Sequence, residues 1–406
     1  MKALLAALLL SFPTLCVLAS LLLLTVSVGL GAYLSWELST PRATGPEPIA
    51  TPSSGDLAAP RATLAALATQ VAALSPVAGA PAPPPAPVQP APFFLPAPIP
   101  HPMAEYTIEG LRARPYPGGT LRVRSVLTTT HTYTRYYVDY PSDGLTITGI
   151  MQIPPGAGPF PVIILNHGYI PRDSFWSGAD TWNAAAYLNQ RGYLTIAPDF
   201  RSWGESDVGV SLLSTGQVID ALNLVSSLPS VAQADFNRVG MWGHSMGGGV
   251  VSKAMTVDPR IKAAVLYAPV SGDDAQVLAR WGSGCRPGPS GEMDERCAGA
   301  EVLTGDMDQR LYLTYTAVVS DRGFLYQTSP INYLEWVAAP VQIHIGTADT
   351  RTPPEWSAAL YEALQAAGKE VEYFTYAGQG HALQGKDWRL FMERSADFYD
   401  RWLAPE

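Results

Sequence analysis

The sequence predicts an α/β fold with a mostly parallel sheet covered by helices on both faces. From residue 162 onward, continuous apolar strand-like runs alternate with helix-like segments, which indicates parallel strands joined by helices. The pentapeptide G-H-S-M-G at 243–247 follows one such run and opens a stretch of small residues, as expected of a sharp strand-to-helix turn. Together, the alternating elements and the pentapeptide predict a sheet that carries a functional site at one edge.

Composition limits the class of protein. The chain has 406 residues, of which 47% are hydrophobic and 15% charged, so it can form one large domain with additional segments. Its formal net charge is -9, and no cluster of Lys and Arg side chains is evident. A nucleic acid partner is therefore excluded, because phosphate binding needs such clusters.

The N-terminal segment, residues 1–40, is predicted to be a membrane anchor or signal segment. No charged side chain occurs from Ala3 to Trp36, a span long enough to cross a bilayer, and Lys2 precedes it. Without a clear cleavage site, an uncleaved anchor is favoured, with the rest of the chain outside the cytoplasm. The alternative is a cleaved signal peptide and a secreted protein.

A Pro/Ala-rich linker is predicted for residues 41–104, since 41–102 holds seventeen of the 37 prolines. The catalytic domain is predicted at 105–406. It opens with strand-like segments at 121–126, 134–140 and 145–153, and a turn at 141–144 predicts that the last two pair antiparallel.

The remaining elements alternate along the chain. Strands are predicted at 162–166, 194–198, 239–242, 263–267, 341–345 and 371–376. Helices are predicted at 180–190, at 216–228, directly after Ser245, at 355–367 and at 388–402. Residues 272–330 interrupt this order and are predicted to form a small inserted cap.

Cys285 and Cys297 lie in the predicted cap, in a segment rich in Gly, Pro and charge. In an exported protein a disulfide between them is expected. No histidine occurs between His244 and His344, so no metal site is predicted, and the chemistry considered below requires no cofactor.

Ser245, at the centre of the pentapeptide, is the candidate nucleophile. Gly243 and Gly247 leave room in a tight turn where a Cβ would collide with neighbouring backbone. The turn projects the serine above the sheet edge. A helix that starts directly after it directs free N–H groups toward developing negative charge.

His381 is the candidate general base. Only His344 and His381 follow Ser245, and this architecture requires a carboxylate and then a histidine after the nucleophile. His344 lies inside the apolar strand 341–345, where a structural role is expected. His381 lies in a Gly-flanked loop between the last predicted strand and the last helix.

Asp349 is the candidate acid, because it follows strand 341–345 at the carboxyl end of the sheet, where catalytic groups gather. The competing carboxylates fall in the predicted cap and are interpreted as solvated surface charges: Asp273, Asp274, Asp294, Asp306, Asp308 and Asp321.

The oxyanion hole needs two donors near Ser245. The N–H of Met246 is one candidate, and the N–H of Tyr169, in the loop 166–169 after a strand, is the other. His167 is expected to brace that loop. The segment 199–206 has the pattern D-x-R-x-x-G-x-S and is interpreted as scaffold, while Trp176 and Trp203 are candidates for a pocket lining.

These motifs resemble the catalytic domain of the prolyl oligopeptidase family of α/β-hydrolases and its dienelactone-hydrolase-like and acetyl-esterase-like relatives. The resemblance covers about 133–403 and is carried by the pentapeptide, N-H-G-Y at 166–169, G-T-A-D at 346–349 and G-Q-G-H at 378–381. It implies the α/β-hydrolase fold and a triad of Ser245, Asp349 and His381.

The resemblance leaves the substrate open. Peptidases of that family usually carry an N-terminal β-propeller, and here a membrane segment, a spacer and a few strands take its place. The expected function is a serine hydrolase that cleaves a small carboxylic ester or a short peptide through an acyl-enzyme on Ser245. The alternative is a non-catalytic cell-surface binding protein on a hydrolase scaffold.

Overall fold

The computed structural model describes residues 103–282 and 309–404. The predicted membrane segment, most of the predicted linker, and Cys285 and Cys297 lie outside the described residues. None of the helices in the two described ranges has both the length and the apolar character needed to cross a membrane.

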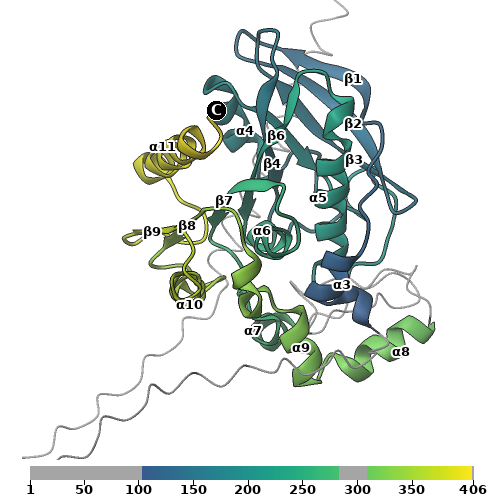
Figure 1. Cartoon of the computed structure of the whole chain (residues 1–406). Coiled ribbons are helices and arrows are strands. Elements are labelled where there is room, and N and C mark those ends of the chain that lie inside the picture. Colours follow the sequence, from purple (N-terminus) through teal and green to yellow (C-terminus); the bar gives the residue numbers. More distant parts are fainter. Residues whose placement is uncertain (1–102, 283–308, 405–406) are drawn as a thin grey trace, which may run out of the picture. The chain divides into compact units, whose positions relative to one another are not determined.

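The described residues form one nine-stranded sheet, shown in Figure 1, in the order β1-β2-β3-β5-β4-β6-β7-β8-β9. The strands are β1 (Arg122–Thr129), β2 (Thr134–Ser142), β3 (Leu145–Ile153), β4 (Phe160–Asn166), β5 (Leu194–Pro198), β6 (Ala234–His244), β7 (Ile261–Tyr267), β8 (Val341–Gly346) and β9 (Val371–Tyr376). Every strand that the sequence predicts is present. The predicted fold class is therefore confirmed.

The first three strands are antiparallel, as predicted. β2 pairs with β3 from Thr134 opposite Ile153 to Ser142 opposite Leu145. The connecting turn is shorter than predicted, because Pro141 and Ser142 continue the strand and only Asp143 and Gly144 turn the chain. Both turn residues have positive φ, 52° and 82°, which is typical of a two-residue hairpin.

The parallel part of the sheet explains the continuous apolar runs. Successive side chains of a strand point to opposite faces. In β4, Val162 and Ile164 join one hydrophobic core, whereas Ile163 and Leu165 join the core on the other face. Because helices cover both faces of the sheet, side chains on both faces are apolar, and apolar and polar residues do not alternate along the strand.

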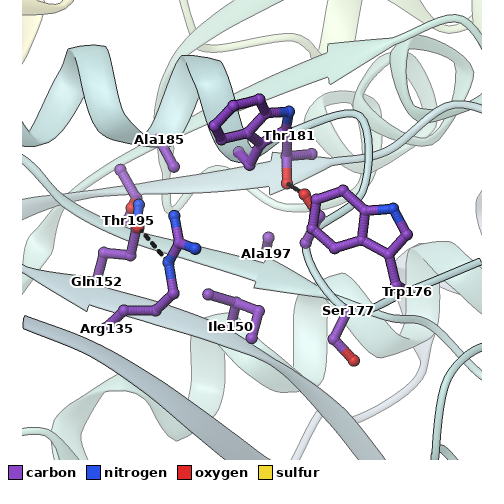
Figure 2. A pocket seen from close by; sticks show the side chains of 11 residues that line it. Arg135, Ile150, Gln152, Trp176, Ser177, Thr181, Ala185, Thr195 and Ala197 are labelled. Atoms are coloured by element: carbon purple, nitrogen blue, oxygen red, sulfur yellow. Dashed lines mark hydrogen bonds between the residues drawn. The ribbon is translucent and has the colours of Figure 1, made fainter. Parts of the chain in front are cut away.

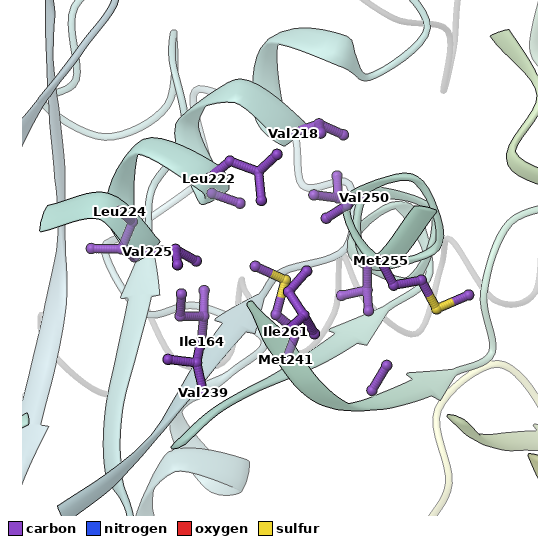
Figure 3. Packing of buried hydrophobic residues seen from close by; sticks show 14 of the residues in the cluster. Ile164, Val218, Leu222, Leu224, Val225, Val239, Met241, Val250, Met255 and Ile261 are labelled. Atoms are coloured by element: carbon purple, nitrogen blue, oxygen red, sulfur yellow. The ribbon is translucent and has the colours of Figure 1, made fainter. Parts of the chain in front are cut away.

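Helices cover the two faces in separate groups. Side chains of α3 (Ile108–Ala113), α5 (Thr215–Ser227), α6 (Met246–Val257) and α10 (Pro354–Ala366) belong to the first core. Side chains of α4 (Trp182–Gln190) and α11 (Gly385–Trp402) belong to the second. Figure 3 shows Val218 and Leu222 of α5 and Val250 of α6 packed over the strand residue Met241.

The sequence does not predict the helical residues that precede the sheet. A short helical segment, η1 (Ala104–Tyr106) and α3, precedes β1. Thr107 caps α3, since its hydroxyl oxygen accepts the N–H of Gly110 at 3.0 Å, and Ile108 and Leu111 are fully buried. Six residues are too few to show a helical period in the sequence.

The predicted cap contains helices in its described parts: α7 (Asp274–Trp281), α8 (Gln309–Val318) and α9 (Arg322–Thr328). The interpretation of Asp274 as a solvated charge is wrong. Its side chain is 6% exposed and accepts a hydrogen bond from Nζ of Lys253 at 2.8 Å. Lys253 lies on α6, the helix that follows the Ser245 turn, so this pair joins α7 of the predicted cap to α6.

Asp274→Ala is expected to lower the free energy of unfolding by about 3–5 kcal/mol, because it leaves the buried ammonium of Lys253 without its carboxylate. Asp273→Ala is the matched control. Asp273 only caps α7 by accepting the N–H of Ala275 at 2.9 Å, and losing such a cap costs about 1 kcal/mol. Denaturant unfolding compares the two variants, and equal losses would contradict the ion-pair assignment.

Candidate active site

Ser245 occupies the sharp turn between β6 and α6. Its backbone has φ 55° and ψ -117°, a conformation that residues with side chains seldom adopt. The N–H of Ser245 donates to the carbonyl of Tyr267 at 2.9 Å, and its carbonyl accepts from the N–H groups of Gly249 and Val270 at 3.2 and 3.1 Å. These bonds hold the strained backbone in place.

The outer glycines of the pentapeptide are required by close backbone contacts, as predicted. A methyl group at Gly243 would lie 2.2 Å from the carbonyl oxygen of Gly247. One at Gly247 would lie 2.0 Å from the carbonyl oxygen of Asn166, at the end of β4. The start of α6 can therefore approach the end of β4 only without side chains at these positions.

Asp349 and His381 are brought together, although 32 residues separate them. Nδ1 of His381 is 2.8 Å from Oδ2 of Asp349. The other carboxylate oxygen accepts the N–H groups of Arg351 and Thr352 at 2.8 and 3.0 Å, and the Thr352 hydroxyl donates to Oδ2 at 2.8 Å. Hydrogen bonds within its own loop therefore fix the orientation of the Asp349 carboxylate that contacts His381.

The two loops that carry these residues are bonded to each other. The N–H of Ala348 donates to the carbonyl of Gln379 at 2.9 Å, and the N–H of Gly378 donates to the hydroxyl of Thr347 at 2.9 Å. Both loops leave the carboxyl ends of adjacent strands, β8 and β9. The separation of Asp349 and His381 is thus set by strand pairing.

The surroundings decide the protonation states. Burial raises the pKa of the Asp349 carboxyl, but the bonds from His381 and Thr352 outweigh it and bring the pKa below 3.8. Burial lowers the pKa of His381 below 6.5 against the opposing bond from Asp349, and the neighbouring His244 adds to the lowering. At neutral pH, Asp349 is thus a carboxylate and His381 is neutral, with Nδ1–H donating and Nε2 able to accept.

No hydrogen bond joins Ser245 and His381 in the part of the chain that the structure describes. The His381 ring packs against the ring of His244, the residue before Ser245, with 4.8 Å between centroids. Among the described residues, neither the Ser245 hydroxyl nor Nε2 of His381 has a hydrogen-bond partner. Such contacts are often long without substrate and shorten when it binds.

The loop after β4 lies directly against Ser245. A methyl group at Gly168 would be 3.2 Å from Cβ of Ser245. The N–H of Tyr169 follows in this loop, and the N–H of Met246 opens α6. Within 103–282 and 309–404, neither of these N–H groups donates a hydrogen bond, so both candidate oxyanion donors remain available next to the serine.

Two histidines have the structural roles that the sequence predicts. The ring nitrogens of His167 lie 2.7 Å from the carbonyl oxygen of Gly168 and 3.1 Å from that of Asp199. The ring of His344 is buried in β8, where it contacts the Tyr376 hydroxyl at 2.9 Å and Oε1 of Gln342 at 2.7 Å.

The segment 199–206 is a scaffold, as interpreted. Arg201 is buried and forms an ion pair with Asp220 of α5 at 2.8 Å. Trp203 does not line a pocket: its side chain is buried, and its indole N–H donates to the carbonyl of Ile170 at 2.9 Å. It is part of the support beneath the loop of Tyr169.

Trp176 does line a hollow, shown in Figure 2. Strands β2, β3 and β5 and the start of α4 contribute its lining: Arg135, Ile150, Gln152, Trp176, Ser177, Gly178, Thr181, Trp182, Ala185, Thr195 and Ala197. Ser245, Asp349 and His381 are not among them. No set of three or more His, Cys, Asp or Glu side chains within the described ranges could hold a metal ion.

Sequence reasoning missed one charged contact of the site. Asp180, predicted as the start of a helix, lies ahead of α4 and contacts His244 with both carboxylate oxygens, at 2.9 and 3.0 Å from Nδ1. His244 occupies a variable position of the G-x-S-x-G pattern, so the pentapeptide assigns it no partner. No local pattern links residues 64 positions apart, so only the fold reveals the pair.

The fold and the site define an α/β-hydrolase scaffold with an Asp–His pair beside a strained serine turn. In agreement, residues 162–397 match the alpha/beta hydrolase family, and the chain belongs to that family.

Similar proteins include an uncharacterized 31.7 kDa protein from the traX-finO intergenic region of Escherichia coli. It is 26% identical over 290 residues, which cover 64% of this chain and 96% of that protein. An acetyl xylan esterase from Paenibacillus sp. R4 has a TM-score of 0.51 and 20% identity over 73% of this chain and 92% of its own. A puromycin-hydrolyzing peptidase of Mycobacterium tuberculosis has a TM-score of 0.50 and 19% identity over 70% and 41%.

Gly247→Ala is expected to destabilise the fold by about 1–3 kcal/mol, because the new methyl group would overlap the backbone carbonyl of Asn166. Gly380→Ala is the control from the same end of the sheet, since a methyl group there meets nothing within 4 Å. Thermal unfolding measures both. A Gly247 variant as stable as the Gly380 variant would show that the turn can accommodate a side chain.

Proposed function

We propose that this chain is a serine hydrolase that cleaves carboxylic esters through an acyl-enzyme on Ser245. The observation that carries the proposal is the 2.8 Å contact between His381 and Asp349, at the sheet edge where Ser245 projects from its strained turn. A hydroxyl, an imidazole and a carboxylate arranged in this way are the groups that acyl transfer requires.

The proposed reaction follows from the protonation states. Nε2 of neutral His381 takes the proton of the Ser245 hydroxyl as Oγ attacks the ester carbonyl carbon, and Asp349 stabilises the resulting imidazolium. His381 then returns that proton to the leaving oxygen, so the alcohol departs and the acyl group remains on Ser245. Water, deprotonated by His381, attacks the acyl carbon; the bond to Oγ breaks, His381 returns the proton to Oγ of Ser245, and the carboxylic acid leaves.

The negative charge that forms on the carbonyl oxygen needs two donors. We assign this role to the N–H groups of Tyr169 and Met246, which are free of other partners among the described residues and flank Ser245. Each such donor contributes about 3 kcal/mol to the stability of the transition state. The positive end of α6 acts in the same direction.

An ester is favoured over a peptide bond by the extent of the similarities. The acetyl xylan esterase is matched over 92% of its length, whereas only 41% of the puromycin-hydrolyzing peptidase is matched. More than half of that peptidase thus has no counterpart in this comparison. A peptidase of the prolyl oligopeptidase type remains the second candidate.

We also propose, from the N-terminal segment of the sequence, that the domain lies outside the cytoplasm.

Ser245→Ala is expected to abolish labelling by a fluorophosphonate probe, because the reactive hydroxyl is lost while the fold remains. Ser174→Ala is the matched control: Ser174 is exposed on the loop that follows Tyr169, and its loss should leave labelling unchanged. Gel fluorescence measures labelling, and circular dichroism checks folding. Undiminished labelling of the Ser245 variant would refute the nucleophile assignment.

Hydrolysis of short p-nitrophenyl esters is expected to exceed hydrolysis of aminoacyl and prolyl p-nitroanilides by at least roughly 10²-fold in kcat/KM, since the esterase is matched over nearly its whole length and the peptidase over only 41%. Absorbance assays on the purified protein compare the two, with Ser245→Ala as the blank. A preference for the anilides would establish the peptidase instead. No turnover of either by folded protein would favour a non-catalytic binding role.

A further inference from the structure

A second aspartate–histidine pair lies next to Ser245. Nδ1 of His244 contacts both carboxylate oxygens of Asp180, and Nε2 of His244 is 3.2 Å from the carbonyl oxygen of His381. Oδ2 of Asp180 also accepts the N–H of Gly168 at 2.7 Å. The pair therefore connects the loop of Tyr169, the serine turn and the loop of His381.

The contacts require a particular protonation state. A neutral imidazole donates from one nitrogen only, whereas both nitrogens of His244 face acceptors. Each acceptor receives a proton only if His244 carries two. Asp180 accepts the N–H of Gly168 and its pKa is lowered, so its carboxylate is ionised. The His244 side chain is 9% exposed and that of Asp180 is 23% exposed, so the pair is largely shielded from water.

The backbone around Asp180 supports a positioning role. Asp180 has φ 66°, a left-handed conformation that is uncommon for a residue with a side chain. Hydrogen bonds on either side hold it there, from the N–H of Ala179 to the carbonyl of Trp176 at 2.8 Å and from the Thr181 hydroxyl to the carbonyl of Gly178 at 3.1 Å. Strain of this kind is concentrated at functional sites.

We propose that His244 is a permanent imidazolium ion paired with Asp180, and that this pair positions the loop of Tyr169 and the general base His381 while its positive charge keeps His381 neutral. The protonation state of His244 can be tested whether or not the chain hydrolyses esters. The positioning role rests on the proposed function of Ser245 and His381.

The charges around the pair agree with this assignment. Burial lowers the pKa of His244, but the charge and hydrogen bond of Asp180 outweigh it, so that its pKa is raised. Burial raises the pKa of Asp180, and His244 and Gly168 reverse this to a net lowering. The other groups that face the pair are Asp349 and His381 of the catalytic loops, Tyr267 stacked on His244 at 4.4 Å, and His167.

A positive charge 4.8 Å from the His381 ring disfavours a second one there. His381 therefore stays unprotonated as the pH falls, and the base form persists to lower pH than an ordinary histidine allows. Removing the charge of His244 should raise the pKa of His381, so the acid limb of the activity profile should move to higher pH. A residue that merely supported the fold would not move it.

The protonation state can be measured without substrate. In the full chain labelled with ¹⁵N-histidine, NMR at pH 7.5 should show the signal of an imidazole with both nitrogens protonated that disappears in His244→Gln. The assignment by substitution separates it from His167, whose ring nitrogens face two carbonyl oxygens. A His244 signal with one protonated nitrogen at that pH would overturn the proposal.

The positioning role is tested by Asp180→Asn, with Asp173→Asn as the control for loss of a negative charge on the same loop. Asp180→Asn is expected to raise the pKa of His381 in the NMR titration and to lower kcat roughly 10²-fold with little change in KM, because the catalytic groups are displaced but substrate contacts are not. Asp173→Asn should change neither.

An unchanged His381 titration in Asp180→Asn would overturn the electrostatic role. If that variant does not fold, His244→Gln carries the same expectation, because it removes directly the positive charge that Asp180 sustains on His244. The NMR measurements also distinguish a failure of the ion-pair proposal from a failure of the proposed hydrolase function. If esters are not hydrolysed but His244 is doubly protonated and the His381 titration shifts as expected, the proposed function fails while the ion pair stands.

Discussion

The close approach of α6 to the end of β4 is the constraint on which the site depends. The turn leaves no space for a side chain at Gly247, which contacts the end of β4, or at Gly243, which contacts the start of α6, and Ser245 between them has φ 55° and ψ -117°. The strained backbone is maintained by three hydrogen bonds to β7, α6 and the segment after β7. Cβ of Ser245 lies 3.2 Å from the place that a methyl group on Gly168 would take, so the serine stands beside the loop of Tyr169.

The site contains two Asp–His pairs whose histidines differ in charge. Asp349 lowers the cost of a transient positive charge on His381, and Asp180 would sustain a permanent one on His244 under our proposal. The two rings are close enough for one charge to oppose the other. The environment thus separates two similar Asp–His pairs into a base that can change its protonation state and a cation that does not.

Most elements of the fold could be predicted because their sequence signals are local. The apolar runs of β4 through β8 reflect strands buried on both faces, and the turn at Asp143 and Gly144 reflects positive φ values. The failures have a common cause. The six-residue helix α3, the ion pair of Asp274 with Lys253, and the burial of Trp203 all depend on contacts with distant segments, which leave no periodic signal.

The sequence alone determined the α/β architecture, the serine turn and the order of Ser245, Asp349 and His381, because each is encoded by neighbouring residues or by chain order. Only the tertiary structure decided that the Asp349 and His381 loops are bonded across adjacent strands, and that Asp180 reaches His244 over 64 positions. The physical reason is that hydrogen bonds and charges act over a few ångströms in space, and strand pairing, which local sequence does not specify, sets which residues come that close.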